Sequence, residues 1–319
     1  MKATLKNDTA IDPLPATERR LAASLDLDEM DVGTMLETMN QQDARAVLAV
    51  REAIPELTTL VSLGTQCLGQ GHRIHYFGAG TSGRLGMLDA TELYPTFNIA
   101  PDTVVAHIAG GLQAMTTAVE NAEDASELDE GEEVSIAPGD LVIGLTASGS
   151  TPYVSAALRS ARRIGAKNAL ICCNPEGACT RYADLTIVLD TGEEFIAGST
   201  RLKAGTAEKL ALNSFSTAVM VRCGKTWSNL MVSVCATNEK LRDRTLRILR
   251  EITGLDDAGS QAALAQAQGD LRVALVSQLA AVDTVQARRR LDEHHWSVKQ
   301  AVDACATKTV AVEDAHHGR

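Results

Sequence analysis

Aromatic side chains are scarce in this 319-residue chain, and basic side chains are outnumbered by acidic ones. Only 3% of the residues are Phe, Trp or Tyr, so the chain offers few rings on which nucleobases could stack. The 30 lysines and arginines stand against 41 acidic residues, and the formal charge of -11 repels a phosphate backbone. Basic clusters around Arg244 and Arg289 are interrupted by acidic residues, as is typical of solvated helix faces. We therefore expect no nucleic-acid partner.

The chain also lacks long apolar runs and metal-type cysteine spacing. No segment reaches the roughly 18 consecutive apolar residues that a membrane span requires, and the N-terminus has no apolar stretch typical of a signal peptide. The 7 cysteines are odd in number and scattered, which predicts free thiols, with Cys172 and Cys173 buried in an apolar run. We expect a cytoplasmic protein that binds no metal and no membrane.

Short β-rich runs alternate with amphipathic stretches over the middle of the chain. The runs cover residues 72–77, 103–108, 140–145, 168–173 and 185–190. Because strands that alternate with helices form a parallel sheet covered on both faces, the pattern predicts an α/β fold with a doubly wound, three-layer arrangement. Ligands of such sheets bind beyond the carboxyl ends of the strands.

Helical patterns flank this central region on both sides. Apolar residues recur at three- and four-residue intervals between about Leu21 and Leu68, which predicts N-terminal helices. After residue 238 we expect three short helices, at 241–253, around 271–282 and ending near residue 305. The predicted parts are an N-terminal helical segment at 1–56, an α/β domain at 57–237, a small helical domain at 238–306 and a disordered tail at 307–319 that includes His316 and His317.

Two loops rich in Gly, Ser and Thr connect predicted strands to the helices that follow. They are GAGTSG (78–83) and TASGST (146–151). Backbone amides and hydroxyls at a helix N-terminus attract anions, so the two loops predict a site for a phosphate monoester. The alternative is that these serines and threonines cap helices without binding a ligand. The candidate binding residues are Gly80, Thr81, Ser82, Gly83, Ser148, Gly149, Ser150 and Thr151.

The first loop also has the glycine spacing of a dinucleotide fingerprint, at Gly78, Gly80 and Gly83. A dinucleotide fold places an acidic residue about twenty positions further on, at the end of the next strand, to hold the ribose. Here that strand ends in His107 and Ile108, which favours a phosphate loop over a cofactor site. For His75 and His107 we expect packing within or at the end of strands.

Longer motifs resemble one known family. The chain is similar to N-acetylmuramic acid 6-phosphate etherases in YFGAGTSGRLGMLDATELYPTF (76–97), AGGLQAMTTAVENAED (109–124), ASGSTPYVSAAL (147–158), GSTRLKAGTAEKLALN (198–213) and GKTWSNLMVSVCATNEKLRDR (224–244). The resemblance implies that residues 57–237 form a sugar-isomerase (SIS) domain that binds a phosphosugar. It also implies that the C-terminal helices resemble the family's small ubiquitin-associated-like domain.

The resemblance places the family's two catalytic carboxylates at Glu92 and Glu123. Without it, Glu92 is an ordinary polar residue ahead of a helix-stopping Tyr-Pro, and Glu123 belongs to a solvated acidic cluster. The implied reaction removes lactate from C3 of the open-chain sugar and then adds water, giving N-acetylglucosamine 6-phosphate and D-lactate. Glu92 would protonate lactate and later activate the water, and Glu123 would handle the C2 proton. No cofactor is needed.

The third loop, which follows the last strand, resembles the family's basic element. This resemblance implies that Ser199, Thr200, Arg201 and Lys203 contact the substrate. For the two basic residues a structural salt bridge is the alternative. An unbroken helix would separate Ser82 from Glu92 by about 15 Å, which is a long reach for one hexose phosphate. We therefore expect helix bending, or a homodimer with active sites at or near the subunit interface.

Four positions depart from the family pattern. Ser150 stands where the family has the arginine of ASGRTP, Thr91 replaces serine, and Leu93-Tyr94 replaces Cys-Pro. Loss of an arginine beside an anionic substrate predicts weaker binding of the lactyl carboxylate, or a related substrate with a different acid ether. The rival functions are a noncatalytic phosphosugar sensor resembling the glucokinase regulatory protein and an aldose-ketose isomerase. The two glutamates and the ether-specific motifs disfavour them.

Overall fold

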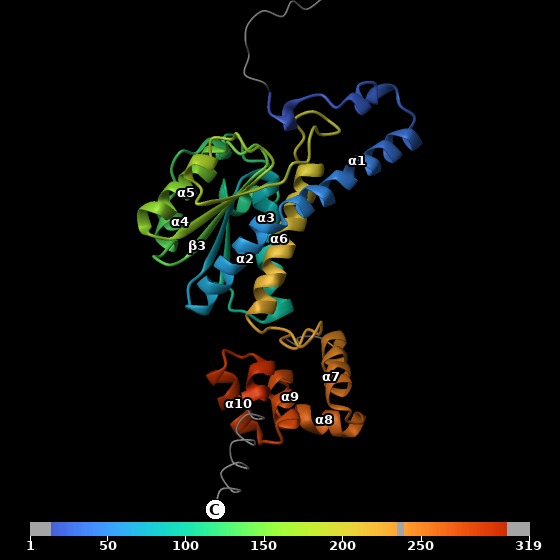
Figure 1. The fold of residues 1–319 in the computed structure, drawn as a ribbon, viewed down its shortest axis with the longest axis vertical. Helices are drawn as coiled ribbons and strands as arrows, with labels where there is room; N and C mark the ends of the chain where they lie inside the picture. The colour runs from blue at the N-terminus through green and yellow to red at the C-terminus, as the bar shows by residue number, and fades with distance from the viewer. Residues whose placement is uncertain (1–13, 235–238, 305–319) are drawn as a thin grey trace, which may run out of the picture. The chain divides into compact units, whose positions relative to one another are not determined.

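The computed structural model describes residues 14–234 and 239–304 of the chain (Figure 1). The predicted tail, with His316 and His317, lies outside the described residues. The chain divides into two compact units. Unit 1 comprises Met1–Thr58, His75–Gly86 and Ala106–Leu212, and unit 2 comprises Thr59–Ile74, Met87–Val105 and Asn213–Arg319.

Five strands form one sheet, and each lies where the sequence predicts a strand. They are β1 (Ile74–Gly78), β2 (Val104–Ile108), β3 (Leu141–Thr146), β4 (Lys167–Cys172) and β5 (Leu185–Val188). Their order is β2-β1-β3-β4-β5, with parallel pairing of β3 to β4 and of β4 to β5. The strand order reverses beside β1 and β3, as in doubly wound sheets, whose ligands bind at this switch point. The predicted α/β fold is confirmed.

Helix α5 (Pro152–Ile164) packs on β3 and β4 and forms much of the core of unit 1. Pro152 at its first position and Gly165, whose φ of 89° is left-handed, set its two ends. Its buried face includes Val154 and Leu158, both 0% exposed. Gly144 of β3 lets the helix approach, because a Cβ there would lie 2.6 Å from Cγ1 of Val154. Figure 1 shows α5 and the short α4 (Glu130–Ser135) beside the sheet.

The two strand histidines belong to this core, as expected. His75 is 0% exposed; its Nδ1 lies 3.2 Å from Nε2 of His107, and its Nε2 lies 3.2 Å from Oδ2 of Asp140. Burial and the neighbouring His75 lower the pKa of His107 to about 4, so its imidazole stays neutral at pH 7. The thiols of Cys172 and Cys173 are free and buried, and burial raises the pKa of Cys172 to about 12.

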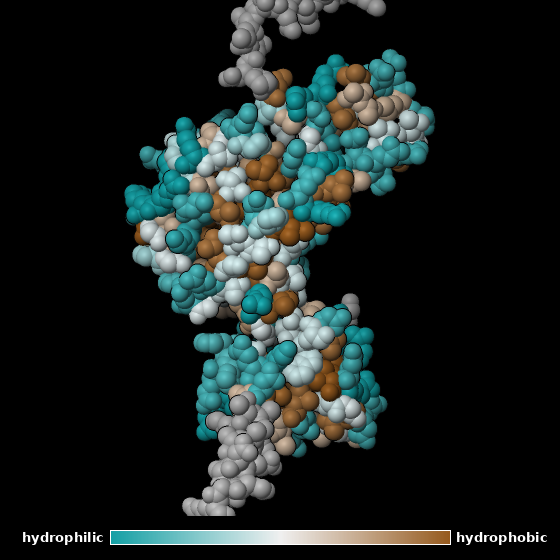
Figure 2. Space-filling view, viewed as in Figure 1, coloured by the Kyte–Doolittle hydropathy of each residue, from teal (hydrophilic) through white to brown (hydrophobic). Residues whose placement is uncertain are grey.

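The N-terminal helices are α1 (Val32–Glu52) and α2 (Ile54–Gly69). Asp31 caps α1 by accepting a hydrogen bond from the backbone N–H of Thr34. Several apolar side chains of α1 remain exposed among polar ones (Figure 2): Val32, Leu36, Val47 and Leu48. The predicted boundary between residues 56 and 57 falls inside α2.

The C-terminal helices outnumber the three that the sequence predicts. They are α7 (Glu239–Thr253), α8 (Asp257–Gln266), α9 (Leu271–Leu279), α10 (Thr284–Glu293) and a further helical stretch at 298–304. The expectation is wrong because two segments taken as connections are helices. Asp256 caps α8 by accepting from Gly259, and Asp283 caps α10 by accepting from Gln286. Within residues 14–234 and 239–304, every helix is too short or too polar to span a lipid bilayer.

Candidate functional site

The first Gly-rich loop is shorter than expected, because helix α3 (Gly80–Phe97) already begins at Gly80. Thr81 and Ser82 therefore lie in the first turn of the helix, where backbone N–H groups lack partners from a preceding turn. Glycine is required for the close approach of strand and helix. A Cβ at Gly78 would lie 2.7 Å from the backbone nitrogen of Gly83, and one at Gly83 would lie 2.6 Å from the carbonyl oxygen of Gly78.

A buried glutamate supports this first turn. The hydroxyl of Ser82 donates to Oε2 of Glu208, at 2.8 Å, from helix α6 (Lys203–Arg222). Glu208 is 3% exposed, and its other oxygen, Oε1, has no hydrogen-bond partner among the described residues. Burial raises the pKa of Glu208 to about 8, so the carboxyl is mostly neutral at pH 7. A neutral carboxyl places no full negative charge beside a loop that is expected to hold phosphate.

The second loop is held together by its own hydroxyls. Oγ1 of Thr146 lies 2.7 Å from Oγ1 of Thr151, and the backbone N–H of Ser150 donates to Oγ of Ser148 at 3.2 Å. The hydroxyl of Ser150 accepts from the backbone N–H of Ala178 at 3.1 Å. Thr151 is the N-cap residue of α5, but its side chain makes no capping hydrogen bond. The simple capping alternative therefore does not account for Thr151.

A close backbone approach fixes the conformation of the second loop. Gly149 has a left-handed φ of 71°, and a Cβ there would lie 2.8 Å from the carbonyl oxygen of Asn174. A Cβ at Gly177 would lie 2.3 Å from the carbonyl oxygen of Gly149. The segment that follows β4 is thus packed directly on the second loop, and both positions require glycine.

The third loop, which leads into α6, is anchored by buried groups. Glu194 is 0% exposed and accepts from the backbone N–H groups of Lys203 and Ala204, at 3.1 and 2.9 Å, at the start of α6. The ammonium of Lys203 donates to Oε1 of Gln42 on α1 at 3.2 Å, and Lys203 is 2% exposed. These contacts favour a structural role for Lys203, through a hydrogen bond to Gln42 and not through the salt bridge suggested by the sequence.

Other residues of the third loop remain accessible. Ser199 and Thr200 are partly exposed and Arg201 is exposed. Among the ion pairs found in the described part of the chain, none includes Arg201. The backbone N–H of Gly198 donates to the carbonyl oxygen of Thr17 at 2.8 Å, so the N-terminal segment contacts this loop as well. Arg201 is therefore the basic residue of this loop that is available for an anion.

The structure brings the three loops together within unit 1. A Cβ at Gly205 would lie 3.3 Å from both Cγ2 of Thr81 and the carbonyl oxygen of Thr200, so the first turns of α3 and α6 are in contact. The first and second loops follow β1 and β3, which are neighbours in the sheet. The described residues contain no group of three His, Cys, Asp or Glu side chains that could hold a metal ion. The arrangement offers hydroxyls, helix N-termini and the exposed guanidinium of Arg201, which suit a phosphate group.

The two predicted catalytic carboxylates are both exposed. Glu92 lies on α3, and Glu123 lies in a 3-10 turn, Ala122–Asp124. The expected helix stop at Tyr94-Pro95 is wrong, because α3 continues through Pro95 to Phe97. Glu92 belongs to unit 2 and Glu123 to unit 1, so their assignment as a catalytic pair stays a prediction.

Glu208 and Glu194 were not predicted from the sequence, although one signal points to Glu208. Ala204, Glu208 and Leu212 recur at four-residue intervals, and all three are buried. A carboxylate at helical spacing within an apolar stripe indicates a buried acid that needs a polar partner. For Glu194, we find no comparable pattern in the sequence.

Comparisons with known proteins agree with this geometry. A family model described as the glucokinase regulatory protein N-terminal SIS domain matches residues 57–162. The N-acetylmuramic acid 6-phosphate etherase of Thermobifida fusca (strain YX) is 52% identical over 263 residues, covering 82% of this chain and 86% of the relative. That of Mycolicibacterium smegmatis is 44% identical over 290 residues, covering 90% and 97%. This chain therefore belongs to the N-acetylmuramic acid 6-phosphate etherase family.

Proposed function

We propose that this protein is an etherase that removes the lactyl group from C3 of N-acetylmuramic acid 6-phosphate. One observation carries the proposal: relatives with this name are 43 to 52% identical to the chain over 82 to 90% of its length. The three contiguous loops of unit 1 support it, because they offer hydroxyls, amides and a cation for a sugar phosphate.

In this proposal the phosphate binds at the first turn of α3 and at the second loop. Thr81 donates from the first loop through its hydroxyl, and Ser82 donates through its backbone N–H, because its hydroxyl proton is held by Glu208. Ser148 and Thr151 donate from the second loop. Glu208 orients the hydroxyl of Ser82, from which it accepts a hydrogen bond. Arg201, exposed and without an ion pair in the described part of the chain, pairs with the phosphate or with the lactyl carboxylate.

The reaction needs one base and one acid, and Glu92 and Glu123 are the proposed pair. In the open-chain aldehyde, Glu123 takes the proton from C2, the C2–C3 double bond forms, and the C3–O bond breaks. The electron pair of that bond goes to the lactate oxygen, which takes a proton from Glu92. Glu92 then removes a proton from water as the water adds to C3, and C2 is protonated again. The products are N-acetylglucosamine 6-phosphate and D-lactate, which makes the enzyme a carbon–oxygen lyase.

We further propose a homodimer with active sites at or near the subunit interface, acting in the cytoplasm. Helix α3 runs without a break from Gly80 to Phe97, which keeps Ser82 and Glu92 about 15 Å apart along its axis. A partner subunit that supplies one of the carboxylates would shorten this reach. Mixed dimers of Glu92→Gln and Ser82→Ala chains test the idea, since only shared sites regain activity.

Release of D-lactate from N-acetylmuramic acid 6-phosphate tests the proposed function directly. We expect turnover by the wild type and a loss of at least about a hundredfold in both Glu92→Gln and Glu123→Gln, because each removes an acid or base. Glu176 is exposed and lies in the segment that follows β4. The variant Glu176→Gln is the charge-matched control and should keep activity. Tight binding of the sugar phosphate without lactate release would instead indicate a noncatalytic regulator.

A further inference from the structure

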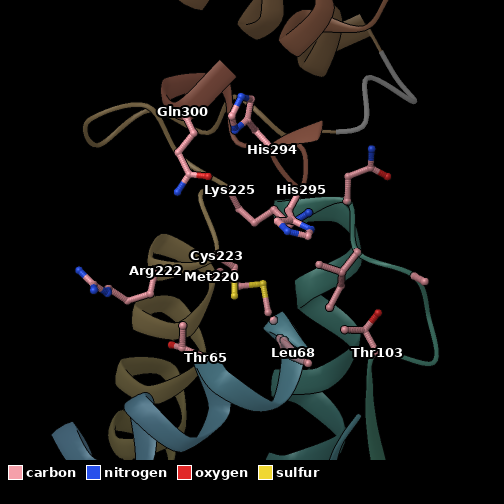
Figure 3. A pocket seen from close by; sticks show the side chains of 14 residues that line it. Thr65, Leu68, Thr103, Met220, Arg222, Cys223, Lys225, His294, His295 and Gln300 are labelled. Carbon is pink, nitrogen blue, oxygen red and sulfur yellow. The ribbon is translucent and has the colours of Figure 1, made fainter. Parts of the chain in front are cut away.

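A pocket of about 350 Å³ lies within unit 2, and basic side chains gather around it (Figure 3). Four of its lining residues carry basic nitrogen groups: Arg222, Lys225, His294 and His295. Figure 3 shows the side chains of Lys225 and His295 extending into the same space. A pocket of this volume lies at the lower end of the range for small-molecule sites and exceeds what a bare phosphate needs.

The charge of the pocket stands out in an acidic chain. Among the residues that the structure describes, no Asp or Glu lines it, although the formal charge of the whole chain is -11. Among the ion pairs of the described residues, none includes Arg222 or Lys225. Burial, together with the charge of Arg272, lowers the pKa of Lys225. A bound anion would compensate for both the burial and the repulsion.

The backbone holds the histidines in place at a cost in strain. His295 and Trp296 both have left-handed φ values, 52° and 61°, which each cost a non-glycine residue about 1 kcal/mol or more. Ser297 packs so closely on Gly224 that a Cβ at Gly224 would lie 2.5 Å from it. The guanidinium of Arg272 covers the Trp296 ring at 4.3 Å from the centroid. The left-handed turn at His295 and Trp296, fixed by these contacts, therefore holds His295 beside Lys225.

Polar and apolar groups complete the lining. Asn98, Thr103 and Gln300 add hydrogen-bonding side chains, while Leu68 and Met220 add apolar surface. We propose that this pocket is a second ligand site, for a phosphorylated small molecule of about hexose size. Lys225 and His295 bind its phosphate, which carries about -1.5 to -2 charges at pH 7. The carbon skeleton lies against Leu68 and Met220. The site is independent of the proposed catalytic function.

Histidine-selective NMR can test the site on the full chain, with N-acetylglucosamine 6-phosphate and inorganic phosphate as probes. The signal of His295, assigned by its loss in His295→Asn, should shift and saturate with the sugar phosphate. Asparagine suits this variant because it tolerates the left-handed backbone. Unphosphorylated N-acetylglucosamine should cause no shift.

Two matched variants decide the outcome. Lys225→Met keeps the aliphatic stem and should weaken the binding seen at His295 at least about tenfold, since a charge-assisted contact is lost. Lys299→Met removes an exposed charge outside the lining and should leave the titration unchanged. An unchanged signal of the core residue His75 reports that each variant is folded. The proposal is overturned if His295 shows no saturable shift up to about 10 mM of either phosphate probe, or shifts equally in Lys225→Met.

Discussion

Replacing Glu208 by glutamine should change how the stability of the protein depends on pH. Glu208 is buried, and its pKa in the folded protein is about 8, against an ordinary value of 4.5. Below pH 4.5 the folded and unfolded chains both keep the proton. Between pH 4.5 and about 8 the unfolded chain releases the proton while the folded chain retains it. The free energy of unfolding therefore falls through this window as pH rises.

The size of the effect follows from the width of that window. The free energy of unfolding of the wild type falls by up to about 1.4 kcal/mol for each pH unit, so the total loss is roughly 5 kcal/mol by pH 8. Glutamine is neutral in both states and keeps a polar partner for the hydroxyl of Ser82, so the variant lacks this loss. The stability of Glu208→Gln relative to the wild type should thus grow by several kcal/mol between pH 5 and pH 8.

Urea unfolding followed by far-ultraviolet circular dichroism measures this difference. Both proteins are unfolded at constant ionic strength over a series of pH values from about 5 to 8.5, and the free energies are subtracted. Glu176→Gln removes one exposed carboxylate and controls for the change in net charge. If the curves of Glu208→Gln and the wild type run parallel across the series, the neutral buried carboxyl is refuted.

Substitutions at three further positions have expected outcomes. Gly83→Ala should destabilise the protein by about 2 kcal/mol or more, measured by thermal unfolding, because its Cβ would lie 2.6 Å from the carbonyl oxygen of Gly78; an unchanged Tm would contradict the close approach. Glu194→Ala should cost about 1 to 3 kcal/mol in urea unfolding, since two buried amides at the start of α6 lose their acceptor; Glu194→Gln should recover part of this loss. Ser150→Arg should lower the KM for N-acetylmuramic acid 6-phosphate by restoring a cation beside the anionic substrate, and a raised KM would argue against a substrate contact there.

The strands could be predicted well from the sequence, and the helix ends could not. The runs that form β3 and β4 are apolar except at their ends, where β4 begins with Lys167 and Asn168 and β3 ends with Thr146, so their pattern is clear. Asp256 and Asp283 illustrate the difficulty with helices. Aspartate next to small residues is typical of turns and of N-caps alike, and only packing of the following helix decides between them.

The site could be predicted in part. The Gly-rich loops carry a local signal, and the structure brings them together, whereas Glu92 and Glu123 were indicated only by resemblance to a family. The sequence allowed either a substrate contact or a structural role for Lys203. Its burial and its hydrogen bond to Gln42 favour the structural role. The support of Ser82 by Glu208 joins residues 126 positions apart, and such a long-range contact leaves little trace in local sequence.

The contacts of the N-terminal segment with the third loop have a consequence for how the chain can be shortened. Thr17 and Gln42 contact the two ends of the stretch from Gly198 to Lys203, one through a main-chain hydrogen bond and the other through the lysine ammonium. Removing residues 1–56 would take away the acceptor of that ammonium and the carbonyl of Thr17, and would release the stretch that carries Arg201. A chain trimmed to its sheet should therefore lose affinity for sugar phosphates even if it folds.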